Sequence, residues 1–252
     1  SYYEGFIRNH ISPALGKTKL HRLAPMNVQA LMNRLAEAGL SPSSVRGLQA
    51  TLRSALSRAV KEGLVEHNAA SKCTPPRLKR SEPAHLDPSQ AKTLMDAVRD
   101  DHIGPLIRFA LATGVRLGEA SGLSWQDVDL SRRAVFVRKQ LQRIDGKMAL
   151  KDLKSASSRR TIPLSDHAVE ALQDAKAWQT LTGIDNPLGL VFLNNEGRSL
   201  DPRYVDRHLK AAMVRAGLRP LSFHKLRHTA ATLMVAGGAT LSEVKNVLGH
   251  GT

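Results

Sequence analysis

The sequence is poor in cysteine, aromatic residues and long apolar segments, and each shortage excludes a class of protein. Cys73 is the one cysteine, so no internal disulfide can form and a reducing cytoplasm is expected. Aromatic residues make up 4% of the chain, which argues against binding single-stranded nucleic acid by base stacking. There is no signal peptide and no apolar run approaching the roughly 18 residues of a membrane span, so membrane spanning is excluded.

Acidic residues are also few relative to basic ones. The 252 residues include 37 Lys and Arg against 22 Asp and Glu, a formal charge of +15. Such a balance favours a polyanionic partner, and nucleic acid is the usual one. A basic ribosomal or membrane-surface protein would share this charge, so charge alone does not identify the partner. The length suits two modest domains.

Residues 1–74 are predicted to form a helical module. Residues 11–16 are expected to turn the chain, and a helix is expected to begin at Pro25 and end at Gly39. Its predicted inward residues are Val28, Leu31, Met32 and Leu35. A second helix is expected from Ser41, with a predicted buried face of Val45, Leu48, Leu52, Leu56 and Ala59.

Another face of that second helix is cationic. Its candidate DNA-binding residues are Arg46, Arg53 and Lys61, with the small residues Ala50 and Ser57 between them. Such a strip could lie against a DNA backbone, because small residues permit close approach. A merely solvated helix face explains the same pattern equally well.

Residues 75–84 are predicted to be a linker, because proline and basic residues dominate them. Residues 85–252 are predicted to form a second domain. Within it, residues 134–164 are the one clearly β-rich stretch, with Asp145-Gly146 as a hairpin turn. Residues 190–193 are expected to form a short strand, and several amphipathic helices surround these segments.

Residues 221–250 carry the clearest chemical pattern. The first of two predicted helices has Ser222 as its N-cap and presents His224, Arg227 and His228 on one face. The second follows Gly237-Gly238 and opens with a capping box, and its predicted buried residues are Leu241, Val244, Val247 and Leu248. Gly249 suits the C-terminal cap, which leaves His250 just beyond the helix end.

These side chains suit a phosphodiester, because Arg binds phosphate through two hydrogen bonds and His moves a proton near neutral pH. Taken singly, each His or Arg is more often a solvated surface group. His224 and His228, four residues apart, could also be half of a zinc site. No Cys or third ligand stands at a helpful spacing, so a metal is disfavoured.

The segments HKLRHT and LGH resemble the second and third catalytic boxes of the tyrosine recombinase (phage integrase) family, H-x-x-R-H-T and L-G-H. Upstream, TGVRLGEASGLSWQDVD resembles the first box, T-G-x-R-x-G-E-x-x-x-L-x-W-x-D-x-D, and contains Arg116 and Glu119. The family commonly carries a lysine as K-T-x-x-S-x-R before a strand. Lys154, Ser158 and Arg160 fit this spacing, although Ser155 replaces the usual Thr. Lys151 is a competitor for the role of the lysine.

The resemblance covers essentially the whole chain. It implies a mainly α fold with a small antiparallel β-sheet, in which a helical core-binding (SAM-like) domain precedes an α+β catalytic domain. It also implies site-specific recombination of double-stranded DNA by a homotetramer, without cofactor or metal. Accessory DNA-bending or directionality proteins are further candidate partners. A cytoplasmic protein encoded by a bacterium, a phage or a mobile element is expected.

The resemblance further implies a role for each matched residue. In the family, a tyrosine attacks the scissile phosphodiester and forms a 3′-phosphotyrosyl link, and strand exchange passes through a Holliday junction. Arg116 and Arg227 would hold the non-bridging oxygens, with Glu119 as an accessory group. His224 would be the base for the nucleophile, Lys154 the acid for the leaving 5′-oxygen, and His250 a further donor to the phosphate.

The nucleophile itself matches no residue of the sequence. In the family it follows the L-G-H histidine by a few residues, near where position 259 would fall. The tyrosines present are Tyr2, Tyr3 and Tyr204, and none belongs to a catalytic box. We therefore expect the natural protein to continue to such a tyrosine, and the 252-residue chain to bind DNA without forming a covalent link.

Two other functions share much of this pattern. A type IB topoisomerase uses the same chemistry but relaxes supercoils as a monomer, and the match to a core-binding domain disfavours it. A DNA-binding module that has lost catalysis is the other, and the intact set of matched side chains argues against it. The sequence does not distinguish integration, excision and dimer resolution, nor does it name the DNA site.

Overall fold

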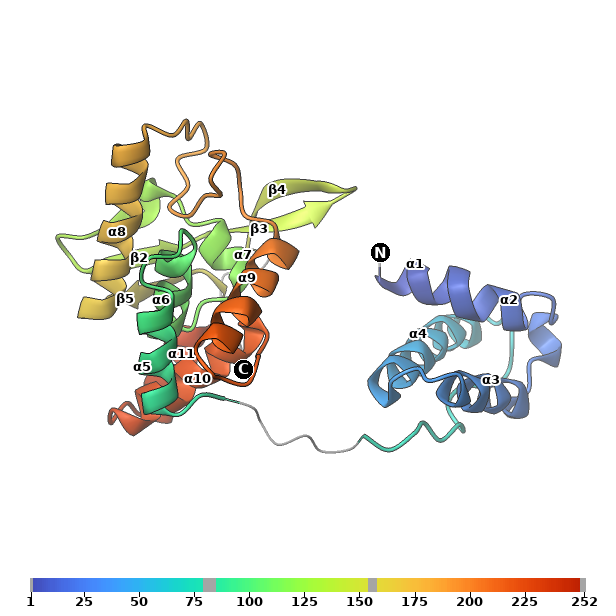
Figure 1. Cartoon of the computed structure of the whole chain (residues 1–252). Coiled ribbons are helices and arrows are strands. Elements are labelled where there is room, and N and C mark those ends of the chain that lie inside the picture. Colours follow the sequence, from blue (N-terminus) through green and yellow to red (C-terminus); the bar gives the residue numbers. More distant parts are fainter. Residues whose placement is uncertain (1, 79–84, 154–157, 250–252) are drawn as a thin grey trace. The chain divides into compact units, whose positions relative to one another are not determined.

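A computed structural model of the chain describes residues 2–78, 85–153 and 158–249. Two compact units are present, Ser1–Glu82 and Pro83–Thr252, and each has its own hydrophobic core (Figure 1). They are called the N-terminal unit and the C-terminal unit below. Lys154 and His250 lie outside the described residues.

The N-terminal unit is helical. Its elements are α1 (Tyr2–Phe6), the π-helical turn η1 (Ile7–Ile11), α2 (Ser12–Leu15), the 3₁₀ turn η2 (Leu20–Arg22), α3 (Pro25–Glu37) and α4 (Pro42–Lys61). Proline in the first turn of α3 and of α4 costs no helical hydrogen bond, because the first N–H groups of a helix have no partner within it. The Ser41 side chain caps α4 by accepting a hydrogen bond from the Ser44 N–H.

The buried faces of α3 and α4 follow the predicted spacing. The buried residues are those expected in both helices: Val28, Leu31, Met32, Leu35, Val45, Leu48, Leu52, Leu56 and Ala59. The prediction that residues 11–16 turn the chain is wrong, because helix continues to Leu15. Pro13 lies in the first turn of α2, and the wide π-turn before it lets the Ser12 N–H donate to the Ile7 carbonyl.

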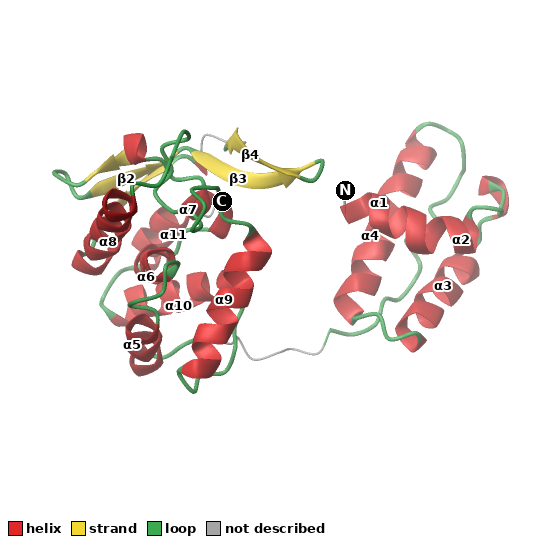
Figure 2. Cartoon of the chain, turned by 45° about the horizontal axis from the view of Figure 1, so that its top comes forward, coloured by secondary structure: helices red, strands yellow, loops and turns green. Residues whose placement is uncertain are grey.

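The C-terminal unit combines helices with two small antiparallel sheets (Figure 2). Its helices are α5 (Pro88–Ala97), α6 (Gly104–Thr113), α7 (Leu117–Ser121), the 3₁₀ turn η3 (Trp125–Asp127), α8 (Asp166–Thr182), α9 (Pro202–Arg215), α10 (Phe223–Ala236) and α11 (Leu241–Leu248). Its strands are β1 (Val128–Asp129), β2 (Ala134–Val137), β3 (Lys139–Ile144), β4 (Lys147–Asp152) and β5 (Arg160–Pro163).

The strands divide at Arg138. Before it, β2 pairs with β1 and β5, with Val135 opposite Ile162. After it, β3 pairs with β4 alone, and the ribbon turns at Asp145-Gly146, where both residues have positive φ as the predicted hairpin turn requires. The expected antiparallel pairing is therefore confirmed, but the strands form two sheets in place of one. Residues 190–193, predicted as a strand, make only isolated bridges through Leu190 and Leu193.

The core of the C-terminal unit is built around α6, which packs on α8 and α10. Leu106, Ile107 and Phe109 of α6 are at most 1% exposed. The burial of Leu241 is a wrong prediction, because its side chain is 72% exposed. The first three residues of α11 are exposed, and Val244 is the first buried residue of the helix, which packs on α10 and β5.

Candidate active site

Arg116 is placed by the turn between α6 and α7. Gly114 ends α6 in the left-handed conformation, with φ 66°, and Arg116 occupies the N-cap position of α7. A Cβ atom at Gly114 would lie 2.5 Å from a methyl carbon of Leu248, so any side chain here would displace Leu248 as well as strain the backbone. The turn therefore positions Arg116 next to the end of α11.

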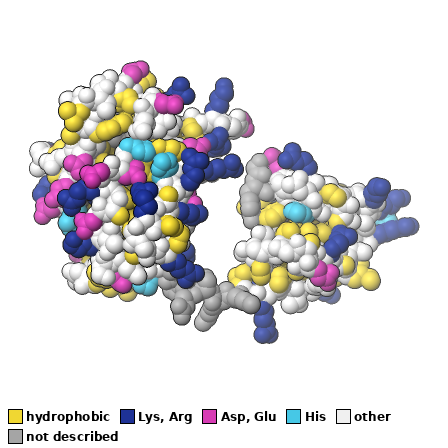
Figure 3. Space-filling view, viewed as in Figure 1, with side chains coloured by type: hydrophobic (Ala, Val, Ile, Leu, Met, Phe, Trp, Pro, Cys, Tyr) yellow, Lys and Arg dark blue, Asp and Glu magenta, His cyan; other side chains and the backbone are white. Residues whose placement is uncertain are grey.

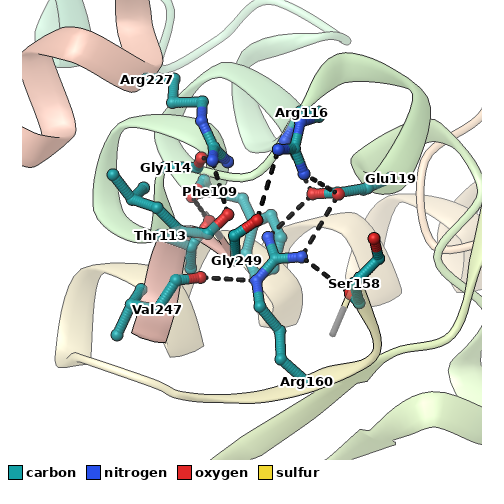
Figure 4. Close-up of polar contacts among 11 residues, drawn as sticks. Phe109, Thr113, Gly114, Arg116, Glu119, Ser158, Arg160, Arg227, Val247 and Gly249 are labelled. Atoms are coloured by element: carbon teal, nitrogen blue, oxygen red, sulfur yellow. Dashed lines mark hydrogen bonds and ion pairs between the residues drawn. The ribbon is translucent and has the colours of Figure 1, made fainter. Parts of the chain in front are cut away.

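The buried carboxylate of Glu119 is held by two arginines (Figure 4). Oε1 accepts from Nη1 of Arg116 at 2.7 Å and from Nη1 of Arg160 at 3.2 Å. Oε2 accepts from the backbone N–H of Arg116 at 3.0 Å and from Nη2 of Arg160 at 2.8 Å. Burial raises the pKa of Glu119, but the bonds and charge of Arg160, followed by the bonds from Arg116, outweigh it and leave the pKa below its usual value. Glu119 is therefore ionised at neutral pH.

Arg227 comes from α10 and is only 4% exposed. Its Nη1 donates to the Gly114 carbonyl at 2.8 Å, and its Nη2 donates to the Leu248 carbonyl at 2.5 Å. Burial, and then the charge of Arg116, lower the pKa of Arg227 to about 10. The guanidinium remains charged at neutral pH, and its bonds join α10 to the turn before Arg116 and to the end of α11.

His224 lies one turn before Arg227 at the start of α10 and is exposed. Its ring meets that of His228 edge-on, with centroids 5.4 Å apart. Partial desolvation of the ring, and then the charges of His228 and Arg227, lower the pKa of His224 below its ordinary value. The imidazole is therefore neutral at pH 7 and has a nitrogen lone pair that can accept a proton.

Arg116, His224 and Arg227 line one pocket of about 370 Å³. The turn after α6, the start of α9 and the start of α10 form its walls, with these lining residues: Val115, Arg116, Leu117, Pro202, Arg203, Asp206, Ser222, Phe223, His224 and Arg227. Several arginines and a neutral imidazole on one concave surface can bind an anionic group and exchange a proton with a molecule attached to it.

A protein-family model described as "Phage integrase family" matches residues 84–252. The chain belongs to the phage integrase family. A second model, "Phage integrase, N-terminal SAM-like domain", matches residues 2–36. The fold class implied by the sequence resemblance is confirmed.

Several curated members of the family are similar along most of their length. "Tyrosine recombinase XerC" of Pseudomonas fluorescens is 29% identical over 96% of this chain and 79% of its own length. "Tyrosine recombinase XerC" of Mycobacterium sp. (strain KMS) is 31% identical over 89% of this chain and 74% of its own length.

Solved structures share the fold of this integrase-family chain. The Tn1549 transposon integrase, in complex with a circular intermediate DNA, superimposes with a TM-score of 0.88 at 20% identity over 99% of this chain and 84% of that one. A lambda integrase tetramer bound to a Holliday junction gives a TM-score of 0.73 at 18% identity, covering 99% and 70% of the two chains. At these identities, the likeness is one of fold.

Most of the described residues that match the family's catalytic boxes line the pocket. Arg116, His224 and Arg227 line it, while Glu119 lies beside Arg116 without lining the pocket. Lys154 and His250 fall outside the described residues. The competitor Lys151 is exposed on β4, paired opposite Gln140.

Sequence reasoning missed Asp206 and Arg203 of α9. Ser222 occupies the predicted N-cap position of α10, but its side chain makes no capping bond. The carboxylate of Asp206 accepts from the Phe223 N–H instead, at 3.0 Å. Arg203 lines the pocket beside it. No local sequence pattern marks either residue, because each reaches the site through the packing of α9 on α10.

Tyr204, in the same helix, is engaged elsewhere. Its hydroxyl lies 2.5 Å from Nε2 of His102, and its ring contacts that of His208 at a tilt of 41°, with centroids 4.2 Å apart. Burial raises the pKa of Tyr204, so its hydroxyl is protonated at neutral pH. Tyr204 is absent from the residues that line the pocket.

Neither a cluster of metal ligands nor a membrane-spanning helix is found among the described residues. Within those ranges, no three His, Cys, Asp or Glu side chains gather as metal ligands would. None of the helices described there has the length and apolarity that crossing a bilayer requires. Basic side chains are spread over the visible face of both units (Figure 3).

The cationic face predicted on α4 is exposed in the N-terminal unit. Arg46, Arg53 and Lys61 are all exposed, and so are the small residues Ala50 and Ser57 between them. The buried face of α4 lies on the other side of the helix. Contact of this face with DNA stays a prediction.

Replacing both Arg46 and Arg53 by alanine is expected to weaken DNA binding and to flatten its salt dependence. Each lost phosphate contact should reduce the slope of log K against log salt by about one unit. Titrations at several salt concentrations measure this slope. Arg58→Ala is the matched control, because Arg58 is exposed on another face of α4 and pairs with Glu62. If the double variant kept the wild-type slope, this face of α4 would be a solvated surface that does not contact DNA.

Proposed function

We propose that this protein carries out site-specific recombination of double-stranded DNA by cutting and rejoining strands through a 3′-phosphotyrosyl intermediate and a Holliday junction. The observation that carries the proposal is the meeting of Arg116, His224 and Arg227 on one pocket. These side chains come from segments more than a hundred residues apart, and family membership gives the combination a chemical meaning.

The proposed chemistry follows from the charges of the pocket. Arg116 and Arg227 bind the non-bridging oxygens of the scissile phosphate and stabilise the charge that develops on pentacoordinate phosphorus. Neutral His224 takes the proton of the attacking tyrosine hydroxyl as the O–P bond forms. The bond to the 5′-oxygen breaks, Lys154 protonates that oxygen, and His250 donates a hydrogen bond to the phosphate. A 5′-hydroxyl of the partner strand then reverses these steps and releases the tyrosine.

The proposed nucleophile is a tyrosine near where position 259 would fall, on the strength of the family pattern. Tyr204 is a poor alternative, because its hydroxyl is hydrogen-bonded to His102 and the residue does not line the pocket. Tyr2 and Tyr3 belong to the N-terminal unit.

The proposed partners are double-stranded recombination sites and three further copies of the protein, in a tetramer around the junction. A lambda integrase tetramer on a Holliday junction is known among the structures that share this fold. Accessory proteins that bend DNA or set the direction of the reaction are further proposed partners. A topoisomerase-like activity and a purely DNA-binding role are the alternatives.

Strand exchange tests the proposed function. The protein with its proposed tyrosine is incubated with two labelled duplexes that carry the same recombination site, and in parallel with a supercoiled plasmid. Exchange of labelled arms between duplexes is the expected result. Relaxation of the plasmid without exchange would favour a topoisomerase, and site binding with neither product would leave a DNA-binding module.

Lys154→Ala is expected to lose cleavage of a normal substrate and to regain it selectively on one with a 5′-bridging sulfur. Sulfur is a better leaving group than oxygen and needs less protonation, so the general acid becomes dispensable. Cleavage rates on the two substrates, compared with wild type, measure the rescue. Lys151→Ala is the matched control, and rescue of that variant in place of Lys154→Ala would move the acid to Lys151.

A further inference from the structure

Arg160 lies next to the pocket and donates hydrogen bonds from all three of its guanidinium nitrogens, although it is not among the lining residues. It begins β5 and is 7% exposed. Its Nε donates to the Val247 carbonyl at 2.6 Å, and its Nη1 donates to the Ser158 carbonyl at 3.3 Å. Its Nη1 and Nη2 also bind both oxygens of Glu119 (Figure 4). One side chain thus joins α7, β5 and the end of α11.

The negative charge of Glu119 competes with a phosphate for Arg116, and Arg160 offsets that charge. A buried carboxylate needs a positive partner, and Arg116 is within 2.7 Å. If Arg116 were the only partner, the two charges would neutralise each other, and little of the charge of Arg116 would reach the pocket. Because Arg160 occupies both oxygens of Glu119, the network keeps an excess of positive charge for a phosphate.

Arg160 also supports the chain at the end of α11. Gly249 has a left-handed backbone with φ 66°, and a Cβ atom there would lie 3.0 Å from Cδ and 3.1 Å from Nη1 of Arg160. The Gly249 backbone therefore rests directly on this guanidinium. The Gly249 carbonyl in turn lies 3.5 Å from Nη2 of Arg116.

We infer that Arg160 is a positioning residue of this site, which neutralises Glu119 and so leaves the guanidinium of Arg116 to bind the phosphate. The inference rests on the proposed function, because it assumes that the pocket holds a phosphodiester. Arg160 is too buried to contact DNA, and it acts through Glu119 and Arg116.

The test uses orthovanadate, a phosphate analogue, as the probe of the 252-residue chain. Its dissociation constant is measured by ⁵¹V NMR titration for wild type, Arg160→Gln, Arg160→Lys, Glu119→Gln and the double variant Arg160→Gln/Glu119→Gln. Arg227→Ala identifies binding at the pocket, because it removes a lining guanidinium. Thermal unfolding of each variant reports whether the fold is retained.

Arg160→Gln is expected to weaken vanadate binding about tenfold, because Arg116 is then the one remaining arginine that neutralises Glu119 and has less charge available for the anion. Adding Glu119→Gln should restore binding to within about threefold of wild type, since it removes the competing charge. Arg160→Lys keeps the charge but loses the fork to both oxygens of Glu119, so it should bind vanadate more tightly than Arg160→Gln and less tightly than wild type. Rescue by a second substitution is not expected of a side chain that acts only by packing.

Several outcomes would overturn the inference. Wild-type affinity in Arg160→Gln would show that Glu119 does not compete for Arg116. A double variant as weak as Arg160→Gln would reduce Arg160 to a packing role. If Arg160→Gln does not fold, loss of binding in Arg160→Lys and in the double variant decides against the charge role. If wild type itself binds no vanadate at the pocket, the phosphate site of the proposed function fails, and this inference fails with it.

Discussion

Cleavage of the scissile phosphodiester is expected to fall by at least about 10²-fold when Arg227 is replaced by alanine. The guanidinium is buried, charged and fixed by two carbonyls, so it is preorganised toward the charge that develops on phosphorus. Arg116→Ala should have a comparable effect, because Arg116 lines the same pocket from another segment. Specific DNA binding should persist, since most of the affinity comes from other phosphate contacts.

The rate is measured with the protein that includes the proposed tyrosine, on a nicked suicide substrate that traps the cleaved product. Arg99→Ala is the matched control. Arg99 follows α5, is exposed, and forms an ion pair with Asp96 of that helix. Arg227→Lys tests geometry separately from charge, because Lys cannot donate to the Gly114 and Leu248 carbonyls as a fork. Near wild-type cleavage by Arg227→Ala or Arg116→Ala would refute the phosphate-binding assignment.

The second large effect concerns covalent attachment to DNA. The 252-residue chain is expected to bind its site and to form no protein–DNA adduct, whereas a protein extended through the proposed tyrosine should form one. The reason is that the Tyr204 hydroxyl is hydrogen-bonded to His102 and Tyr204 is not among the residues that line the pocket. Tyr2 and Tyr3 belong to the other unit and to no catalytic box.

The measurement is a denaturing gel of a labelled suicide substrate after incubation with each protein. Replacing the added tyrosine by phenylalanine in the longer protein is the control, and it should remove the adduct while leaving site binding unchanged. An adduct from the 252-residue chain would mean that one of its own tyrosines is the nucleophile. Tyr204→Phe would then show whether that tyrosine is Tyr204.

Local sequence determined most of the secondary structure and pointed to Arg116, His224 and Arg227 among the residues that line the pocket. The buried faces of α3 and α4 follow helical spacing, and Asp145-Gly146 forms the hairpin turn, because neighbouring residues alone decide these features. The boxes that contain Arg116 and Arg227 were likewise recognisable without a structure, since each is a run of adjacent residues.

Tertiary structure alone decided how those residues are held. The bonds between Arg160 and Glu119 join residues 41 positions apart, and the Asp206 cap of α10 joins residues 17 positions apart. The exposure of Leu241 depends on where α11 meets α10 and β5, which its apolar spacing does not reveal. A periodic pattern reports which face of a helix is apolar, whereas the partner that covers that face, or completes a buried ion pair, comes from a distant part of the chain.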